Sequence, residues 1–428
     1  MTEKGKDCEV GDKVRIKTTK EEIEGILLES HEPGVFLIKL ESGYNMGIKK
    51  EDVTEVKLLE KAKKSEVESE FKLSGKKPIV DLIICGGTIS SSLDSKTGAV
   101  KWVTKPEDLF RFYPEIFDLC DIRIINPFMK ASENMSSYDW IKIAKQVVKS
   151  LNEDNVHGVI ITHGTDFLHY TASALSFFLK NITKPVVLTY SQRSTDRGSS
   201  DAELNLYCSA KAALSDIAEV MLVGHASSND DFCYALQGNK CRKMHSSARD
   251  AFKPINCLPI AKIYKDKLEV LRSYNKKKTG KENKIELDAV FEEKIALVKF
   301  YPGQNPEILE HYAKEGYKGI VIEMSGLGHV LTEGKNDWLP VLKEIIKKGM
   351  IVCAVGQTIY GRLDPLVYSP GRELQKAGVI YLGDMLAETA FVKLSWVLGK
   401  FGEKAKKEEV EKLMLKNIAG EFNERLVE

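Results

Sequence analysis

Four short segments of the chain, at 86–89, 131–136, 162–166 and 242–247, carry side chains that together could perform acyl-transfer chemistry. They supply a hydroxyl nucleophile, a second hydroxyl, a carboxylate and an amine. A threonine hydroxyl can attack a carbonyl carbon while a lysine, or a hydroxyl held by a lysine, moves the proton, so this chemistry requires no metal. The residues predicted to be catalytic are Thr88, Thr165, Asp166 and Lys243.

Each segment taken alone also has a structural explanation. The GGT sequence at 86–88 is typical of a tight turn or a phosphate-binding loop, although the glycine spacings of P-loops and dinucleotide folds are missing here. Asp166 could cap a helix predicted over 167–178, and Lys243 could be a surface charge. The combination favours a catalytic site, because the carboxyl ends of parallel strands meet at one edge of a sheet.

The elements that must position these segments are apolar strands that alternate with longer amphipathic stretches. Fully apolar strands separated by helices are typical of a parallel sheet covered on both faces, which predicts an α/β fold. We expect a larger α/β domain over 78–274 and a smaller one over 287–428. The larger domain should hold strands at 78–85, 121–126, 157–162, 185–190 and 218–225, and a helix over 137–151.

The first 60 residues have a different pattern, with short β-branched segments separated by turn residues. They predict a small, SH3-like β-barrel over 1–60, followed by a charge-mixed linker over 61–77. The expected strands lie near 13–17, 23–30, 35–40, 43–48 and 53–58. Residues 1–77 contain 16 Lys and Arg against 17 Asp and Glu, so the barrel is no obvious binding site for RNA. Docking a protein or covering the larger domain are the alternatives.

The composition is that of an ordinary globular protein. The 428 residues include 63 Lys and Arg and 62 Asp and Glu, and a net charge of +1 provides no diffuse basic field. No apolar run reaches the roughly 18 residues needed to span a bilayer, and the first residues are polar, so we expect a cytoplasmic protein without membrane contact. Eight cysteines without a Cys-x-x-Cys pair indicate reduced thiols, with Cys85 and Cys353 in the core.

Several motifs together closely resemble the bacterial-type L-asparaginase/glutaminase family. They are CGGTIS, THGTDFLHYTASAL, CRKMHSSARDAF and GQTIYGRLDPLVYSPGRELQKAGVIYLGDM, and the resemblance covers residues 78–428. The barrel-like extension and the SENM and RKMHSS segments are similar to one branch of this family, the glutaminase subunits of archaeal Glu-tRNA(Gln) amidotransferases. The resemblance implies an asparaginase-like fold of two parallel-sheet domains behind the barrel, and a homodimer.

The resemblance also implies a role for each catalytic candidate. Thr88 matches the nucleophile of the GGT turn, Thr165 and Asp166 match the HGTD pair, and Lys243 matches the lysine that hydrogen-bonds the second threonine. The implied reaction is hydrolysis of the side-chain amide of glutamine through an acyl-threonine. Which of the two threonines attacks stays open. The expected division of labour is that Asp166 binds the substrate ammonium group while Lys243 orients Thr165.

Four residues are expected to bind the substrate. Ser132 matches the family position that holds the α-carboxylate, and Glu133 and Asp166 suit the α-ammonium group. The backbone N–H of Gly164 is a candidate oxyanion donor. One departure from the family is that the loop over 90–102 contains no tyrosine, where many asparaginases place a catalytic one.

The chain has no nucleotide-binding loop with which to activate the glutamyl group of a misacylated tRNA. The resemblance and this missing motif imply that ATP and Mg²⁺ are used by a partner, the kinase/transamidase subunit of the complex, and that this chain needs no cofactor. They also imply a heterotetramer with two copies of each polypeptide, in which the partner makes most tRNA contacts. The alternatives are a free-standing L-asparaginase and a catalytically inactive scaffold. A Ser/His hydrolase is disfavoured because no G-x-S-x-G elbow occurs.

Overall fold

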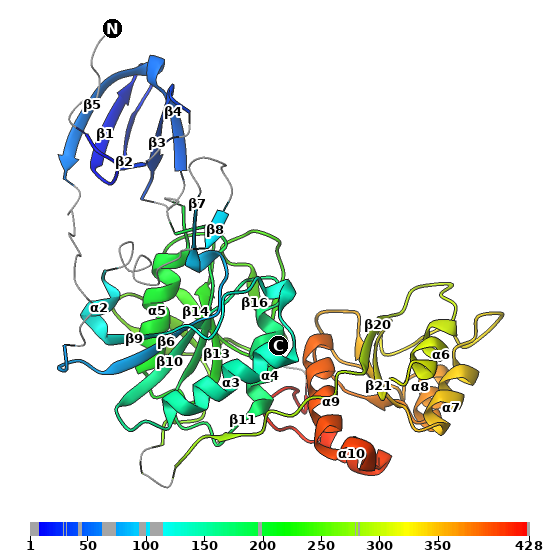
Figure 1. Ribbon diagram of the computed structural model, residues 1–428. Helices are drawn as coiled ribbons and strands as arrows, with labels where there is room; N and C mark the ends of the chain where they lie inside the picture. Colours follow the sequence, from blue (N-terminus) through cyan, green and yellow to red (C-terminus); the bar gives the residue numbers. More distant parts are fainter. Residues whose placement is uncertain are drawn as a thin grey trace.

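The computed structural model consists of an N-terminal β module, a larger α/β domain and a smaller α/β domain (Figure 1). The structure describes residues 8–28, 30, 32–41, 45–61, 74–93, 100–102, 114–195, 199–278, 280 and 283–425. Most of the expected linker, residues 62–73, therefore lies outside the described residues.

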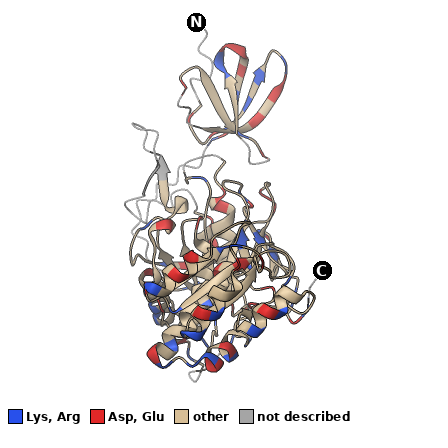
Figure 2. Ribbon diagram, turned by 90° about the vertical axis from the view of Figure 1, so that its right-hand side faces the viewer, with Lys and Arg blue, Asp and Glu red and all other residues tan. Residues whose placement is uncertain are grey.

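The N-terminal module is a five-stranded antiparallel sheet with the strand order β4-β3-β2-β1-β5. Alternate residues of its strands point inward, so that Val14, Ile16 and Ile38 lie in a small core. This confirms the β-rich extension predicted from the sequence. Acidic and basic residues are interspersed over the module (Figure 2). Its strands are β1 (Lys13–Thr18), β2 (Glu22–Leu28), β3 (Val35–Lys39), β4 (Asn45–Lys49) and β5 (Val53–Glu60), with a 3-10 turn, η1 (Lys50–Asp52).

The larger domain is built on an eight-stranded sheet with the order β18-β17-β14-β13-β12-β10-β6-β9. Its five apolar strands run parallel, as predicted: β6 (Ile79–Ile84), β9 (Asp121–Ile125), β10 (Val156–Thr162), β12 (Val186–Thr189) and β13 (Val220–His225). Three antiparallel strands that were not predicted extend one side: β14 (Cys233–Gln237), β17 (Ala261–Ile263) and β18 (Leu268–Val270). Antiparallel neighbours need no crossover helix, so the helix–strand alternation ends here.

Helices cover both faces of this sheet, as an apolar parallel sheet requires. One face packs against α3 (Ser137–Leu151) and α4 (Leu168–Phe178), and the other against α2 (Ile116–Leu119) and α5 (Ala202–Leu214). Ser136 and Asp139 form a capping box that begins α3, which explains part of the polar segment before it.

The smaller domain contains four parallel strands, β20 (Ile295–Lys299), β21 (Gly319–Met324), β22 (Ile351–Gly356) and β23 (Ile380–Tyr381). One face carries α6 (Glu307–Lys314), α7 (Leu339–Lys347) and α8 (Ser369–Ala377). The other face carries α9 (Ala387–Phe401), which also packs against α4, where the hydroxyls of Ser173 and Thr389 lie 3.0 Å apart. Helix α9 therefore joins the two domains, and α10 (Lys407–Met414) follows a 3-10 turn, η4 (Gly402–Lys404).

Short elements complete the carboxyl edge of the large sheet. They are η2 (Thr88–Ser90), η3 (Ser132–Asn134) and the hairpins β7 (Ser91–Leu93) with β8 (Val100–Trp102) and β15 (Cys241–Lys243) with β16 (Phe252–Pro254). The pair β11 (Leu179–Lys180) and β19 (Glu286–Leu287) lies elsewhere in the domain. The N-terminal module stands over this carboxyl edge, and a cavity of about 390 Å³ between them is lined by Ile26 and Lys39 on one side and by Asp230 on the other (Figure 1).

All eight cysteines are free thiols, and Cys85 and Cys353 are buried in the core as expected. None of the helices in the described part of the chain is both long enough and apolar enough to span a bilayer.

Candidate active site

The GGT turn directly follows the central strand β6 and requires glycine at both of its first positions. Gly86 and Gly87 have positive φ angles of 120° and 89°. A β-carbon on Gly86 would overlap the carbonyl oxygen of Lys130, and one on Gly87 would overlap the backbone of His163. The turn leaves Thr88 partly exposed as the first residue of η2. The two glycines thus bring the predicted nucleophile against the HGTD loop.

The HGTD loop follows β10 and is anchored by its histidine. His163 is completely buried, with Nδ1 2.7 Å from the carbonyl oxygen of Gly164 and Nε2 2.8 Å from the hydroxyl of Thr171. Burial lowers the pKa of His163 to about 4, so the ring is neutral near pH 7. The buried histidine holds the loop, and Thr165 and Asp166, two and three residues further along, reach the surface.

Lys243 joins the second threonine and the aspartate. Its Nζ donates hydrogen bonds to Thr165 Oγ1 at 2.8 Å and to Asp166 Oδ1 at 2.7 Å. The lysine side chain is 10% exposed, whereas that of Asp166 is 61% exposed. A largely enclosed ammonium group therefore holds the Thr165 hydroxyl, and Asp166 compensates its charge while still reaching solvent.

The position of Lys243 along the fold differs from the expected one. We predicted that all four segments follow strands of the main sheet, but Lys243 is the last residue of β15, in a separate two-stranded hairpin. The β15–β16 hairpin lies beside the HGTD loop. Lys243 therefore reaches the predicted site from this hairpin rather than from the end of a strand of the main sheet.

The SEN segment packs against the same loop. Ser132 is buried, and its Oγ accepts a hydrogen bond from the backbone N–H of Phe167 at 3.3 Å. A β-carbon on Gly164 would lie 3.0 Å from that oxygen. Glu133 follows on the exposed side of η3. Ser132, which we expect to hold the substrate α-carboxylate, thus lies beside the HGTD loop.

The structure brings the predicted residues together in two ways. Thr165, Asp166 and Lys243 are in direct contact, whereas Thr88 is connected to them through the close packing of Gly87 on the HGTD loop. Within the described residues, no hydrogen bond joins the Thr88 hydroxyl to the other three groups. The described part of the chain also contains no group of three His, Cys, Asp or Glu side chains suited to a metal ion.

A buried charged group behind the site was not predicted. Glu388, at the start of α9, is 2% exposed and accepts a hydrogen bond from Arg242 at 3.3 Å, next to Lys243. Its Oε1 lies 3.8 Å from Nε2 of buried His169. Burial raises the pKa of Glu388 and lowers that of His169 to about 3. The available signal was a glutamate at the start of a largely apolar helix, α9.

Three family models match the chain in sequence order. The model for the GatD N-terminal domain matches residues 8–59, the one for asparaginase, N-terminal, matches 79–276, and the one for the glutaminase/asparaginase C-terminal domain matches 294–414. Curated relatives match it almost from end to end. The GatD subunit of the glutamyl-tRNA(Gln) amidotransferase from Pyrococcus furiosus is 47% identical over 430 residues, which cover 98% of this chain and 96% of the relative.

The chain belongs to the GatD family of glutamyl-tRNA(Gln) amidotransferase subunits. The GatD subunit from Methanobrevibacter smithii is 42% identical over 97% of this chain and 94% of its own, and the one from Sulfolobus acidocaldarius is 40% identical over 97% and 92%. These matches confirm the family that the motifs and the N-terminal extension predicted.

Solved asparaginases share the fold of the two α/β domains. The L-asparaginase of Thermococcus kodakarensis is 29% identical with a TM-score of 0.71, and the match covers 81% of this chain and 100% of that enzyme. L-asparaginase I of Vibrio cholerae is 26% identical with a TM-score of 0.69, covering 81% and 99%. The predicted asparaginase-like fold class is therefore confirmed.

Proposed function

We propose that this chain is the glutaminase subunit of a tRNA-dependent amidotransferase. It hydrolyses glutamine and supplies ammonia for the conversion of Glu-tRNA(Gln) to Gln-tRNA(Gln). The observation that carries the proposal is the similarity to GatD relatives along nearly the whole chain, the N-terminal module included. The contacts of Lys243 with Thr165 and Asp166 support an intact hydrolytic site.

In the proposed reaction Thr88 Oγ adds to the amide carbon of glutamine. The C–N bond breaks, the amide nitrogen takes up a proton and leaves as ammonia, and a γ-glutamyl ester remains on the threonine. Water then adds to the ester, releases glutamate and returns the proton to the threonine oxygen. Backbone N–H groups of the two glycine-containing loops, near Thr88 and Gly164, are the proposed donors to the oxyanion.

The ion pair at the site supports a positioning role for Lys243. Its Nζ donates hydrogen bonds to Thr165 Oγ1 at 2.8 Å and to Asp166 Oδ1 at 2.7 Å, so that two partners fix the position of the amine. We therefore assign Lys243 to holding the Thr165 hydroxyl. Asp166 is exposed enough to accept the α-ammonium group of the substrate as well, with Ser132 directed at the α-carboxylate.

The assembly is part of the proposal. The partner, a kinase/transamidase polypeptide, would use ATP and Mg²⁺ and make most contacts with the tRNA, while this chain would use no cofactor and act in the cytoplasm. Exposed apolar side chains gather at the carboxyl edge of the small sheet and support a homodimer. They are Tyr301, Tyr360, Leu366, Val367 and Tyr368. Two copies of each polypeptide would then form the complex.

The decisive experiment is reconstitution with a co-expressed partner and Glu-tRNA(Gln). We expect amidation that depends on glutamine and ATP. Thr88→Ala should abolish amidation with glutamine but preserve it with ammonium chloride, because free ammonia bypasses only the glutaminase step. Undiminished glutamine-dependent amidation in Thr88→Ala, Thr165→Ala and Lys243→Ala would support a catalytically inactive scaffold instead.

A second candidate is a free-standing L-asparaginase, which the solved structural neighbours favour. It would hydrolyse asparagine rapidly as the isolated chain, and neither tRNA nor a partner would stimulate it. Measuring ammonia release from asparagine and glutamine, with and without the partner, distinguishes the two.

A further inference from the structure

Two neighbouring cavities open at the amino edge of the eight-stranded sheet, opposite the candidate active site. Their volumes are about 790 and 590 Å³, and Lys278 lines both of them. Strand β10 begins beside the smaller cavity at Val156 and ends at Thr162, before the HGTD loop. Because a strand of this length spans about 20 Å, the cavities are well separated from the catalytic groups.

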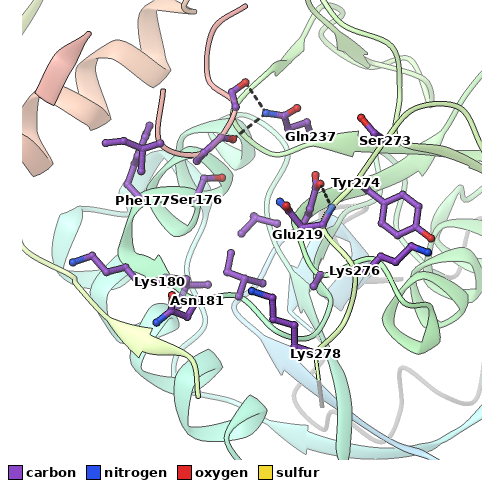
Figure 3. Close-up of a pocket in the computed structure, with 18 of the residues that line it drawn as sticks. Ser176, Phe177, Lys180, Asn181, Glu219, Gln237, Ser273, Tyr274, Lys276 and Lys278 are labelled. Carbon is purple, nitrogen blue, oxygen red and sulfur yellow. Dashed lines mark hydrogen bonds between the residues drawn. The ribbon is translucent and has the colours of Figure 1, made fainter. Parts of the chain in front are cut away.

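The two cavities carry an excess of positive charge that the whole chain lacks. Their walls include five lysines that have no carboxylate oxygen within 4 Å in the described part of the chain: Lys184, Lys276, Lys277, Lys278 and Lys284. Among the described residues, only two acidic ones line the cavities, Asp154 and Glu219, and Glu219 is paired with Arg272. Figure 3 shows the side chain of Lys278 extending into the space that the labelled residues surround. We call this combined surface the basic depression.

Burial and mutual repulsion disfavour the charged forms of some side chains in the basic depression. Burial lowers the pKa of the Lys184 amine, and the neighbouring charge of Lys277 lowers it further. Burial also lowers the pKa of Lys277 itself. The pKa of His157 is lowered by burial and then by Lys277. A bound anion would relieve this repulsion, since each cationic group would gain an opposite charge.

We propose that the basic depression binds the phosphodiester backbone of an RNA. The lysines line two adjoining cavities, so that a chain of phosphates, rather than one phosphate, is needed to reach them all. Lysines act as point charges and lack the bidentate geometry of arginine, which suits contacts that do not read sequence. Hydroxyl and amide groups of Asn181, Ser273 and Tyr274 lie among them as further partners for phosphate or sugar.

A narrow phosphodiester backbone can enter these recesses more easily than the carboxylates of a folded protein surface, since Lys184 and Lys277 are half-buried. The identification of this RNA as the tRNA substrate rests on the proposed function. The polyanion site itself does not depend on it.

The test measures binding of fluorescently labelled tRNA to the purified full-length chain by anisotropy, at salt concentrations between about 50 and 200 mM. The variant Lys276→Gln/Lys278→Gln/Lys284→Gln removes three exposed charges from the depression. The matched control, Lys343→Gln/Lys347→Gln/Lys376→Gln, removes three exposed charges from helices of the smaller domain. Ammonia release from glutamine is measured for both variants.

We expect the depression variant to bind tRNA at least about tenfold more weakly, and the slope of log affinity against log salt to fall by about 2 to 3. The control should bind like the unaltered chain, and both variants should keep their glutaminase activity. Equal weakening in the two variants, or no measurable binding by the unaltered chain, would overturn the proposal.

Two other anions test whether the basic depression is specific for RNA. Displacement of tRNA by millimolar inorganic phosphate would indicate a small-anion site, and lysine-dependent binding of polyglutamate but not tRNA would indicate an acidic protein partner. Either result overturns RNA binding. Lysine-dependent tRNA binding without any amidation in the reconstituted complex would contradict the proposed function alone. Normal amidation without lysine-dependent tRNA binding would contradict RNA binding by the basic depression, but not the proposed function.

Discussion

The two edges of the large sheet differ in whether their cationic side chains are paired with carboxylates. At the carboxyl edge Lys243 contacts Thr165 and Asp166, and the neighbouring Arg242 contacts the buried Glu388. At the amino edge five lysines of the basic depression have no carboxylate partners among the described residues. The carboxyl edge is thus organised before any ligand binds, as a reaction that depends on orientation requires. The amino edge is electrostatically incomplete.

This difference follows from how each edge is built. The carboxyl edge is formed by tight loops in which Gly87 and Gly164 permit contact between backbone segments. The amino edge includes the charged connection around 275–286, which contributes most of the unpaired lysines. A catalytic site needs fixed distances, whereas a site for a polyanion needs only charge density.

The difference between the two edges depends above all on the carboxyl edge being a reaction centre. We expect Thr88→Ala and Thr165→Ala each to lower kcat/KM for glutamine by about 1,000-fold or more, because each removes a hydroxyl that the proposed chemistry requires. Thr88→Ser should retain measurable activity, since it keeps the hydroxyl. Ammonia release provides the measurement, and either alanine variant retaining a tenth of the activity would contradict the prediction.

The role of preorganisation is tested by Lys243→Met, which keeps much of the side-chain volume but removes the donor to Thr165. We expect kcat/KM to fall by about 100-fold with an unchanged fold by circular dichroism. Lys243→Arg should not restore activity, because a guanidinium cannot occupy the same geometry. The control Lys262→Met on β17 should behave like the unaltered protein, and equal losses in both would refute a local role.

Glu388 tests whether the smaller domain supports the site. Glu388→Ala leaves Arg242 without its partner and should lower kcat/KM about tenfold, because the strand that ends in Lys243 loses an anchor. Glu388→Gln retains a hydrogen-bond acceptor and should recover most of the activity. If alanine and glutamine are equally active, Glu388 has no positioning role.

The buried histidines behind the site should make stability depend on pH. His169 is neutral in the folded protein because burial lowers its pKa to about 3, whereas the unfolded chain takes up this proton below about pH 6.5. Acidification from pH 6.5 to 4 therefore favours the unfolded state at this residue. In urea unfolding, His169→Gln should lose less stability over this range than the unaltered protein. The control variant His311→Gln, which replaces an exposed histidine, should lose as much stability over this range as the unaltered protein.

The smallest effect is expected at the amino edge. Lys278→Gln should change kcat/KM for glutamine by less than about twofold, because the depression and the reaction centre lie at opposite ends of the strands. A large loss in a correctly folded variant would show that the two edges are coupled and that the comparison between them is wrong.

Much of the architecture could be predicted from local patterns. Apolar runs identified the five parallel strands, and the GGT and HGTD loops were recognisable because glycine, hydroxyl and acidic residues follow those runs directly. The three antiparallel strands were not predicted, since short strands with mixed burial have weak patterns. Glu388 was not predicted either, because a glutamate on a helix does not reveal its partner 146 positions earlier in the chain.

The sequence by itself determined the residue types of the site and the strand ends that carry most of them, because turn geometry and strand burial are local properties. It also determined the charged connection from which the basic depression is formed. Only the tertiary structure decided that the β15 hairpin brings Lys243 to the HGTD loop and that α9 places Glu388 behind it. Those contacts join distant segments, and their formation depends on packing of the whole sheet and both domains rather than on any local preference.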